Sequence, residues 1–193
     1  MLTKLFLFFL LNHMSYVDSS ISSSALTTKT ISVKIDKDSI KSRIEYLNSK
    51  TPFQIDYTPL LEETIINHLE NRQATYLELY SKSDYFFPIF ENALQKYNVP
   101  LELKYLPVVE SALNPRAKSR VGATGLWQFM FNTAKDLDLK VNSYVDERMD
   151  PVKSSEAAAK YLSELYTRFN DWNLAIAAYN YCLLYTSPSP RDA

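Results

Sequence analysis

The sequence predicts an all-α fold. Apolar residues recur every three or four positions in several segments, as in amphipathic helices, and no run of more than a few residues alternates with period two. With 193 residues and 46% hydrophobic content, the chain is long enough to bury one substantial core and a small accessory segment. Its formal net charge of -1 gives no reason to expect a nucleic-acid surface.

The first 17 residues have the residue pattern of an export signal. Lys4 is followed by seven apolar residues, too few to span a bilayer, which takes about 20. No small-x-small cleavage site follows, so a buried N-terminal strand or helix start is the alternative. Residues 18–50 read as a Ser/Thr-rich linker that leads into a weak helix.

Residues 51–83 are expected to form a helical N-terminal extension. After Thr58 and Pro59, apolar residues at helical spacing predict one or two packing helices, with Leu61, Ile65, Ile66, Leu69 and Leu77 as their apolar positions. Ser83 and Asp84 then precede a further helix, which we expect from Tyr85 to Tyr97.

A helix from Leu101 to Glu110 is predicted next, with Pro100 at its start. Pro107 lies inside it and is expected to cause a kink or an early end just before Glu110. Apolar neighbours on both sides of Glu110, and its place at a helix C-terminus, favour a carboxyl with a raised pKa, as a general acid needs. The alternative is a partly buried salt-bridge partner.

The only two glycines, Gly122 and Gly125, lie in one loop that begins after Asn114-Pro115. Because glycine permits positive φ and close approach to the backbone, we expect this loop to face a ligand. A short helix near residues 132–137 follows. The acidic stretch 146–150 is interpreted as a structural turn rather than as a second catalytic carboxylate, with Arg148 holding it through the neighbouring acids.

Two more helices are predicted at the C-terminal end. Asp150 caps the first, Pro151 occupies its first turn, and its apolar positions run to Phe169. Asn170 or Asp171 then caps a buried helix from Trp172 to Tyr179. Judged from this helix alone, Tyr179 would be a core residue and the following Asn180 would be a C-cap.

Residues 182–193 are expected to be a non-native tail, because they resemble the translation of an adapter used to prepare DNA sequencing libraries. The lone Cys182 would then be foreign, and no disulfide framework is expected. The two histidines are isolated, so no metal site is expected either.

Several motifs in a fixed order resemble the lytic transglycosylases of glycoside hydrolase family 23. The resemblance covers roughly residues 84–181, and its motifs are Glu110-Ser111, Asn114-Pro115, Gly122-Ala123, Gly125-Leu126-Trp127-Gln128, Asp146-Glu147-Arg148 and Ala178-Tyr179-Asn180. It implies a lysozyme-like, goose-type helical domain at residues 84–181, incomplete at its C-terminal end and preceded by the helical extension.

The resemblance also implies roles for individual residues. Glu110 matches the catalytic acid and base of the family, and Ser111 matches a residue that orients it and the substrate. The substrate-binding positions are Gly125, Leu126, Trp127 and Gln128 of the glycan-binding motif, and Tyr179 and Asn180 of the last motif. Core packing explains Trp127 almost equally well, and a glycine usual in the family soon after Asn180 is absent.

The expected activity is the non-hydrolytic cleavage of peptidoglycan strands between N-acetylmuramic acid and N-acetylglucosamine, giving 1,6-anhydromuramoyl ends without a cofactor. The expected location is the bacterial cell envelope, and the resemblance allows for membrane association and for LysM-type repeats after residue 181. A goose-type lysozyme-like hydrolase is the alternative enzyme. An inactive glycan-binding module and a helical interaction domain are the alternatives that are not enzymes.

Overall fold

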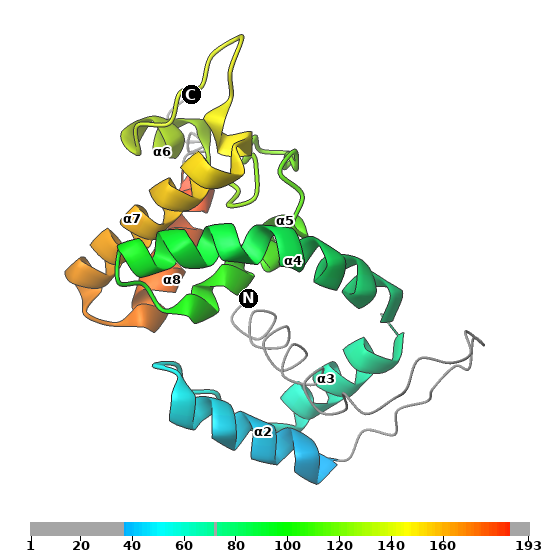
Figure 1. Cartoon of the computed structure of the whole chain (residues 1–193). Coiled ribbons are helices and arrows are strands. Elements are labelled where there is room, and N and C mark those ends of the chain that lie inside the picture. Colours follow the sequence, from blue (N-terminus) through cyan, green and yellow to red (C-terminus); the bar gives the residue numbers. More distant parts are fainter. Residues whose placement is uncertain (1–36, 72, 186–193) are drawn as a thin grey trace, which may run out of the picture. The chain divides into compact units, whose positions relative to one another are not determined.

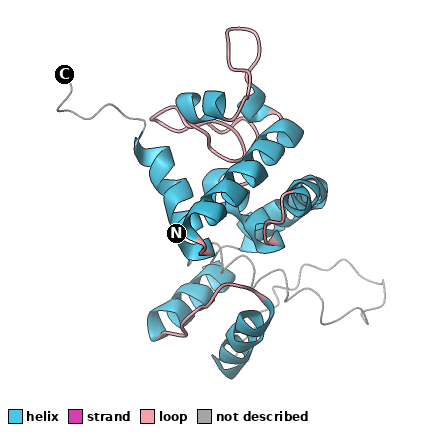
Figure 2. Cartoon of the chain, turned by 90° about the vertical axis from the view of Figure 1, so that its left-hand side faces the viewer, coloured by secondary structure: helices cyan, strands magenta, loops and turns pink. Residues whose placement is uncertain are grey.

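The computed structural model describes residues 37–71 and 73–185, and the predicted export signal and most of the linker lie outside them. The chain divides into two compact units, residues 1–77 and 78–193. The all-α prediction is confirmed, because the described residues contain helices joined by loops and no strand (Figures 1 and 2). Strand-like pairing among them is limited to isolated β-bridges.

The first unit contains the helices α2 (Lys37–Lys50) and α3 (Pro59–Asn71) and the first residues of α4 (Gln73–Lys96). The hydroxyl of Thr58 accepts the backbone N–H of Leu61 at 3.1 Å and caps α3, which begins after Thr58 as predicted. The buried core of this unit contains residues from α2 and α3: Ile40, Ile44, Leu47, Leu61 and Ile65.

Helix α4 (Gln73–Lys96) is much longer than the sequence predicts. The expected helix start at Ser83-Asp84 is wrong, because the Ser83 hydroxyl donates to the carbonyl of Tyr80 at 2.7 Å, within the helix, instead of capping a new one. Leu77, predicted as an apolar packing position, is 72% exposed. Pro88 lies inside α4 without ending it.

The segment before the candidate acid folds as two short helices, η2 (Leu101–Tyr105), a 3-10 helix, and α5 (Leu106–Ser111). The predicted single helix with a break just before Glu110 is therefore wrong. Pro107 stands in the first turn of α5, where a missing N–H costs no helical hydrogen bond. The break falls at Leu106, and Glu110 lies in the last turn of an unbroken α5.

Four further elements complete the second unit: α6 (Phe131–Asp136), η3 (Glu147–Met149), α7 (Pro151–Phe169) and α8 (Trp172–Tyr185). The Asp150 carboxylate accepts the N–H groups of Val152 and Lys153 at 2.9 Å, so the predicted cap of α7 is confirmed. Asp171 caps α8 in the same way, with its carboxylate accepting the Leu174 N–H at 2.9 Å.

Helices α7 and α8 pack side by side (Figure 1). The predicted helix end at Tyr179 is wrong, because α8 runs on to Tyr185, and Asn180 lies inside the helix and is not its C-cap. No described helix has both the length and the apolar character that a membrane crossing requires.

Candidate active site

Glu110 combines burial with the lack of a partner. Its side chain is half-buried near the end of α5, and its Oε1 atom is buried without a hydrogen-bond partner among the described residues. Burial in the protein raises the pKa of this carboxyl from 4.5 to about 7, because the anion loses its hydration. The structure therefore does not support the salt-bridge alternative for Glu110.

The chain turns sharply after Ser111. Ala112 and Leu113 both have left-handed backbone conformations, with φ of 51° and 56°, which ends α5 one residue after Glu110. Leu113 is 1% exposed, and its burial helps to offset the cost of this conformation. The Ser111 hydroxyl donates to the Pro107 carbonyl at 2.9 Å, so in this structure it bonds within its own helix.

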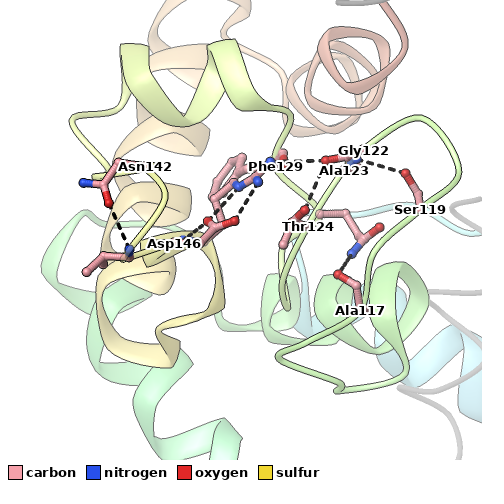
Figure 3. A network of polar contacts seen from close by, with 11 residues as sticks. Ala117, Ser119, Gly122, Ala123, Thr124, Phe129, Asn142 and Asp146 are labelled. Carbon is pink, nitrogen blue, oxygen red and sulfur yellow. Dashed lines mark hydrogen bonds and ion pairs between the residues drawn. The ribbon is translucent and has the colours of Figure 1, made fainter.

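The loop between α5 and α6 is held by hydrogen bonds between its own backbone groups (Figure 3). The Ala117 carbonyl accepts the Gly125 N–H at 2.9 Å and the Gln128 side-chain amide at 3.3 Å. The same amide donates to the Gly125 carbonyl at 2.8 Å, and the Gln128 side chain is buried. Gln128 therefore stabilises the turn that carries the predicted glycan-binding motif.

Arg148 anchors this loop to η3. Its guanidinium makes two hydrogen bonds to the Asp146 carboxylate, at 2.7 and 2.9 Å, so the prediction that the neighbouring acids hold Arg148 is confirmed. It also donates to the carbonyls of Gly122 at 3.2 Å and Phe129 at 3.1 Å. These two carbonyls stand on either side of the motif, so one buried side chain fixes both ends of it.

The two glycines serve different purposes. A Cβ on Gly125 would lie 1.8 Å from the Arg148 carbonyl oxygen, whereas a Cβ on Gly122 would meet nothing within 4 Å. Both have positive φ, 88° and 93°. The close approach at Gly125 is therefore to the protein's own backbone, so the interpretation that a ligand requires this glycine is not supported.

The other predicted substrate-binding side chains are largely buried. Leu126 and Trp127 are fully buried, and the Trp127 indole donates to the Ser155 hydroxyl at 3.0 Å, which favours core packing for this ring. Tyr179 is also fully buried, and its hydroxyl donates to the Trp127 carbonyl at 2.7 Å, tying α8 to the turn. Asn180 is half-buried on α8.

The acids of the 146–150 turn are engaged in structural contacts. Asp146 binds Arg148, and Glu147 accepts the Lys140 N–H at 2.7 Å and pairs with Lys153 at 2.5 Å. These partners hold the pKa of both carboxyls below the usual range, with the side-chain hydrogen bond as the largest cause in each. Within the described residues, no three His, Cys, Asp or Glu side chains cluster to hold a metal ion.

Hydrogen bonds thus join Gly125, Trp127, Gln128 and Tyr179 into one unit, while Glu110 and Ser111 lie on α5. The sequence did not lead us to predict the hydrogen bonds from the Arg148 guanidinium to the carbonyls of Gly122 and Phe129. The scarcity of glycine was the available signal, since it marks where backbone approaches backbone as well as where it approaches a ligand.

Comparison with known proteins finds a match between residues 87–185 and the Transglycosylase SLT domain. Membrane-bound lytic murein transglycosylase D of Escherichia coli (strain K12) is 42% identical over 88 residues, covering 45% of this chain and 20% of that protein. A protein of Alteromonas sp. (strain M-1), named for tributyltin chloride resistance, is 35% identical over 109 residues, covering 56% of this chain and 52% of its own.

Membrane-bound lytic murein transglycosylase F of Pseudoalteromonas translucida (strain TAC 125) is 35% identical over 104 residues, covering 48% of this chain and 21% of that protein. The chain therefore spans between about a fifth and about half of the length of these relatives.

The two glycines offer a matched pair of substitutions. Gly125→Ala is expected to lower the free energy of unfolding by about 2–5 kcal/mol, because a left-handed alanine is strained and its Cβ overlaps the Arg148 carbonyl. Gly122→Ala brings the same strain into open space and should cost about 1 kcal/mol. Urea denaturation of both variants measures the difference, and equal losses would contradict the contact with Arg148.

Glu110 should make stability depend on pH. Its folded pKa of about 7 exceeds the ordinary value of 4.5, so between these pH values the folded state holds a proton that the unfolded state has released. Stability from this group is complete below pH 4.5 and is lost as pH rises through 7.

Glu110→Gln removes the titrating carboxyl and with it the loss of stability as pH rises. Relative to the wild type, the variant should gain stability as pH rises from 4.5 to 7, reaching up to about 3 kcal/mol. Urea denaturation at pH 4.5, 6 and 8 measures the gain. A difference between the two proteins that stays constant with pH would show that the carboxyl is not buried in this way.

Proposed function

The chain belongs to the Transglycosylase SLT domain family, and from this we propose that it is a peptidoglycan lytic transglycosylase in which Glu110 is both acid and base. The buried and unpartnered Oε1 atom of Glu110, with a pKa of about 7, carries the proposal. A carboxyl with this pKa holds a proton in part of the molecules at neutral pH and accepts one in the rest, so it suits either task. The similarity to two lytic murein transglycosylases supports it.

In the proposed reaction, the same carboxyl acts first as an acid and then as a base. Protonated Glu110 first gives its proton to the glycosidic oxygen between N-acetylmuramic acid and N-acetylglucosamine, and that C–O bond breaks. The resulting carboxylate then takes the proton of the C6 hydroxyl of the muramic acid, whose oxygen attacks the anomeric carbon. The product is a 1,6-anhydromuramoyl end, and Glu110 is protonated again.

The state of the other acids favours this route over hydrolysis. A hydrolase commonly uses a second carboxylate to activate water or to stabilise the oxocarbenium-like centre. In the 146–150 turn, Asp146 and Glu147 are held in ion pairs, so neither is available for that task. Intramolecular attack by the C6 hydroxyl needs no second acid and gains from proximity, with effective molarities that reach about 10⁵ M.

The other predicted residues would act mainly by holding the turn in place. Gly125, Leu126, Trp127 and Gln128 are buried and shape the turn. Tyr179 would support the same turn through the Trp127 carbonyl. Direct contacts of Ser111, Gln128, Tyr179 or Asn180 with the substrate remain predictions.

We further propose that the protein works in the bacterial cell envelope, where peptidoglycan lies. The names of its relatives describe membrane-bound proteins, which supports this location. Export by residues 1–17, attachment to a membrane, LysM-type repeats after residue 181 and a foreign origin of residues 182–193 remain predictions.

Replacing the acid tests the proposal. Glu110→Gln, in the full-length protein, should lower cleavage of purified peptidoglycan by at least about 10²-fold, because the amide keeps the shape but cannot give up the proton. Binding to insoluble peptidoglycan should persist. Glu164→Gln changes an exposed acid on α7 and serves as the control with unchanged activity. Retention of more than half of the activity by Glu110→Gln would exclude Glu110 as the acid.

The product separates the proposed function from its enzymatic alternative. Mass spectrometry of digested peptidoglycan should show 1,6-anhydromuramoyl ends, lighter by one water than the hydrolysed ends, with no new reducing sugar. Mainly reducing muramic acid ends would identify a goose-type lysozyme-like hydrolase. Binding without any cleavage by the wild type would identify an inactive glycan-binding module.

A further inference from the structure

Three cations follow the candidate acid at alternate positions. Arg116, Lys118 and Arg120 are all exposed, and the two residues between them, Ala117 and Ser119, are half-buried. Exposed and half-buried positions thus alternate along this part of the loop, with Lys118 in a β-bridge and Arg116 and Arg120 in turns. The three cations are called the basic strip below.

The hydrogen bonds of the intervening residues show which face turns inward. The Ser119 hydroxyl accepts the Ala123 N–H at 3.0 Å, and Lys118 forms an antiparallel bridge with Thr124. The Asn114 side chain accepts the Arg116 N–H at 2.9 Å and so fixes the start of the strip. Figure 3 shows Ala117 and Ser119 engaged with the rest of the loop. The basic strip is therefore the outer edge of a braced segment.

The charges of the strip are not used by the fold. Among residues 37–71 and 73–185, no carboxylate lies within ion-pair distance of Arg116, Lys118 or Arg120, whereas Arg148 and Lys153 are both paired. The positive charge of Lys118 contributes to the lowered pKa of Asp146, but both carboxylate oxygens of Asp146 bind the Arg148 guanidinium. In a chain of net charge -1, three such cations in five residues are a local concentration of positive charge.

The strip must lie near the reacting bond. Arg116 is six residues after Glu110, so the two Cα atoms are at most about 20 Å apart, and the turn at Ala112-Leu113 shortens this distance. Ala117, inside the strip, is hydrogen-bonded to the Gly125–Gln128 turn. Five residues reach at most about 13 Å from the first Cα to the last, so the three cations lie within the length of a short extended peptide.

We propose that the basic strip binds the carboxylates of the peptide stem that muramic acid carries, so that the enzyme favours strands with stems over bare glycan. The inference rests on the proposed function. While the stem is attached, the lactyl carboxyl of muramic acid is part of an amide, so the glycan itself is uncharged and the anionic groups closest to the bond that Glu110 would cleave are those of the stem. An anionic membrane is the competing partner, but a strip bonded to the turn beside the candidate acid is placed for substrate.

The test compares two triple variants of the full-length protein. In the first, Arg116, Lys118 and Arg120 become Gln; in the control, Lys135, Lys160 and Arg168, three exposed cations on or beside α6 and α7, become Gln. Both variants change the net charge by the same amount. The substrates are purified peptidoglycan and the same material stripped of its stems by an amidase, which removes the stem carboxylates and leaves one lactyl carboxylate on each muramic acid.

The readout is the ratio of kcat/KM on stem-bearing strands to that on stripped strands. We expect the strip variant to lower this ratio roughly 3- to 30-fold, mainly through KM, because each exposed charge contact contributes little by itself. Added salt should lower the ratio of the wild type in the same direction. The control variant should keep the ratio of the wild type. A strip variant whose ratio equals that of the wild type would overturn the proposal.

Binding gives a second measure that needs no turnover. In the Glu110→Gln background, sedimentation with stem-bearing peptidoglycan should weaken when the strip is neutralised and stay the same with the control. Weaker binding to vesicles that contain anionic lipid, with peptidoglycan binding intact, would assign the strip to a membrane instead. If the wild type forms no anhydro ends, the proposed function fails, whatever the strip binds.

Discussion

The contact between Arg148 and the glycine-containing loop is the constraint on which the site depends. A buried guanidinium is costly unless its donors are satisfied, and here Asp146 and the carbonyls of Gly122 and Phe129 satisfy them. The Arg148 carbonyl in turn fills the space that Gly125 leaves empty. The turn that follows Gly125 presents the Trp127 carbonyl to Tyr179, so α8 is positioned by the same network.

This arrangement separates two kinds of acid. Asp146 and Glu147 have cationic partners, which stabilise their anions and fit them for structural work. Glu110 has no such partner for its buried oxygen, so hydration is lost without compensation and the proton is retained up to about pH 7. The difference arises from neighbours and not from the residue type, because Glu110 and Glu147 have the same side chain.

Local signals in the sequence predicted much of the fold. The all-α class follows from the spacing of apolar residues along the chain, and the capped starts of α7 and α8 follow from a few adjacent residues, as at Asp150-Pro151. The wrong predictions concern residues whose local sequence is compatible with two different structures. A Ser at position 83 can cap a helix or bond back within one, and Pro107 can break a helix or begin one. Tertiary packing decides between them.

The site shows the same limit. The motifs identified Glu110, but only the structure shows that its Oε1 atom is buried without a hydrogen-bond partner among the described residues. Gly125 was singled out for its close approach, yet only the structure shows that its neighbour is the Arg148 carbonyl. The assignment of Trp127 to glycan binding or to the core was left open, and its bond to Ser155, 28 residues away, favours the core.

In the loop between α5 and α6, the groups on the inner face and those on the outer face have separate roles. The inner groups, such as the Ser119 hydroxyl and the Ala117 carbonyl, are committed to hydrogen bonds that hold the turn in place. The outer side chains of the basic strip make no such commitment, so changing them alters what the loop attracts without changing how it folds. Recognition can therefore vary at the outer positions, while the inner hydrogen bonds and Glu110 keep the chemistry constant.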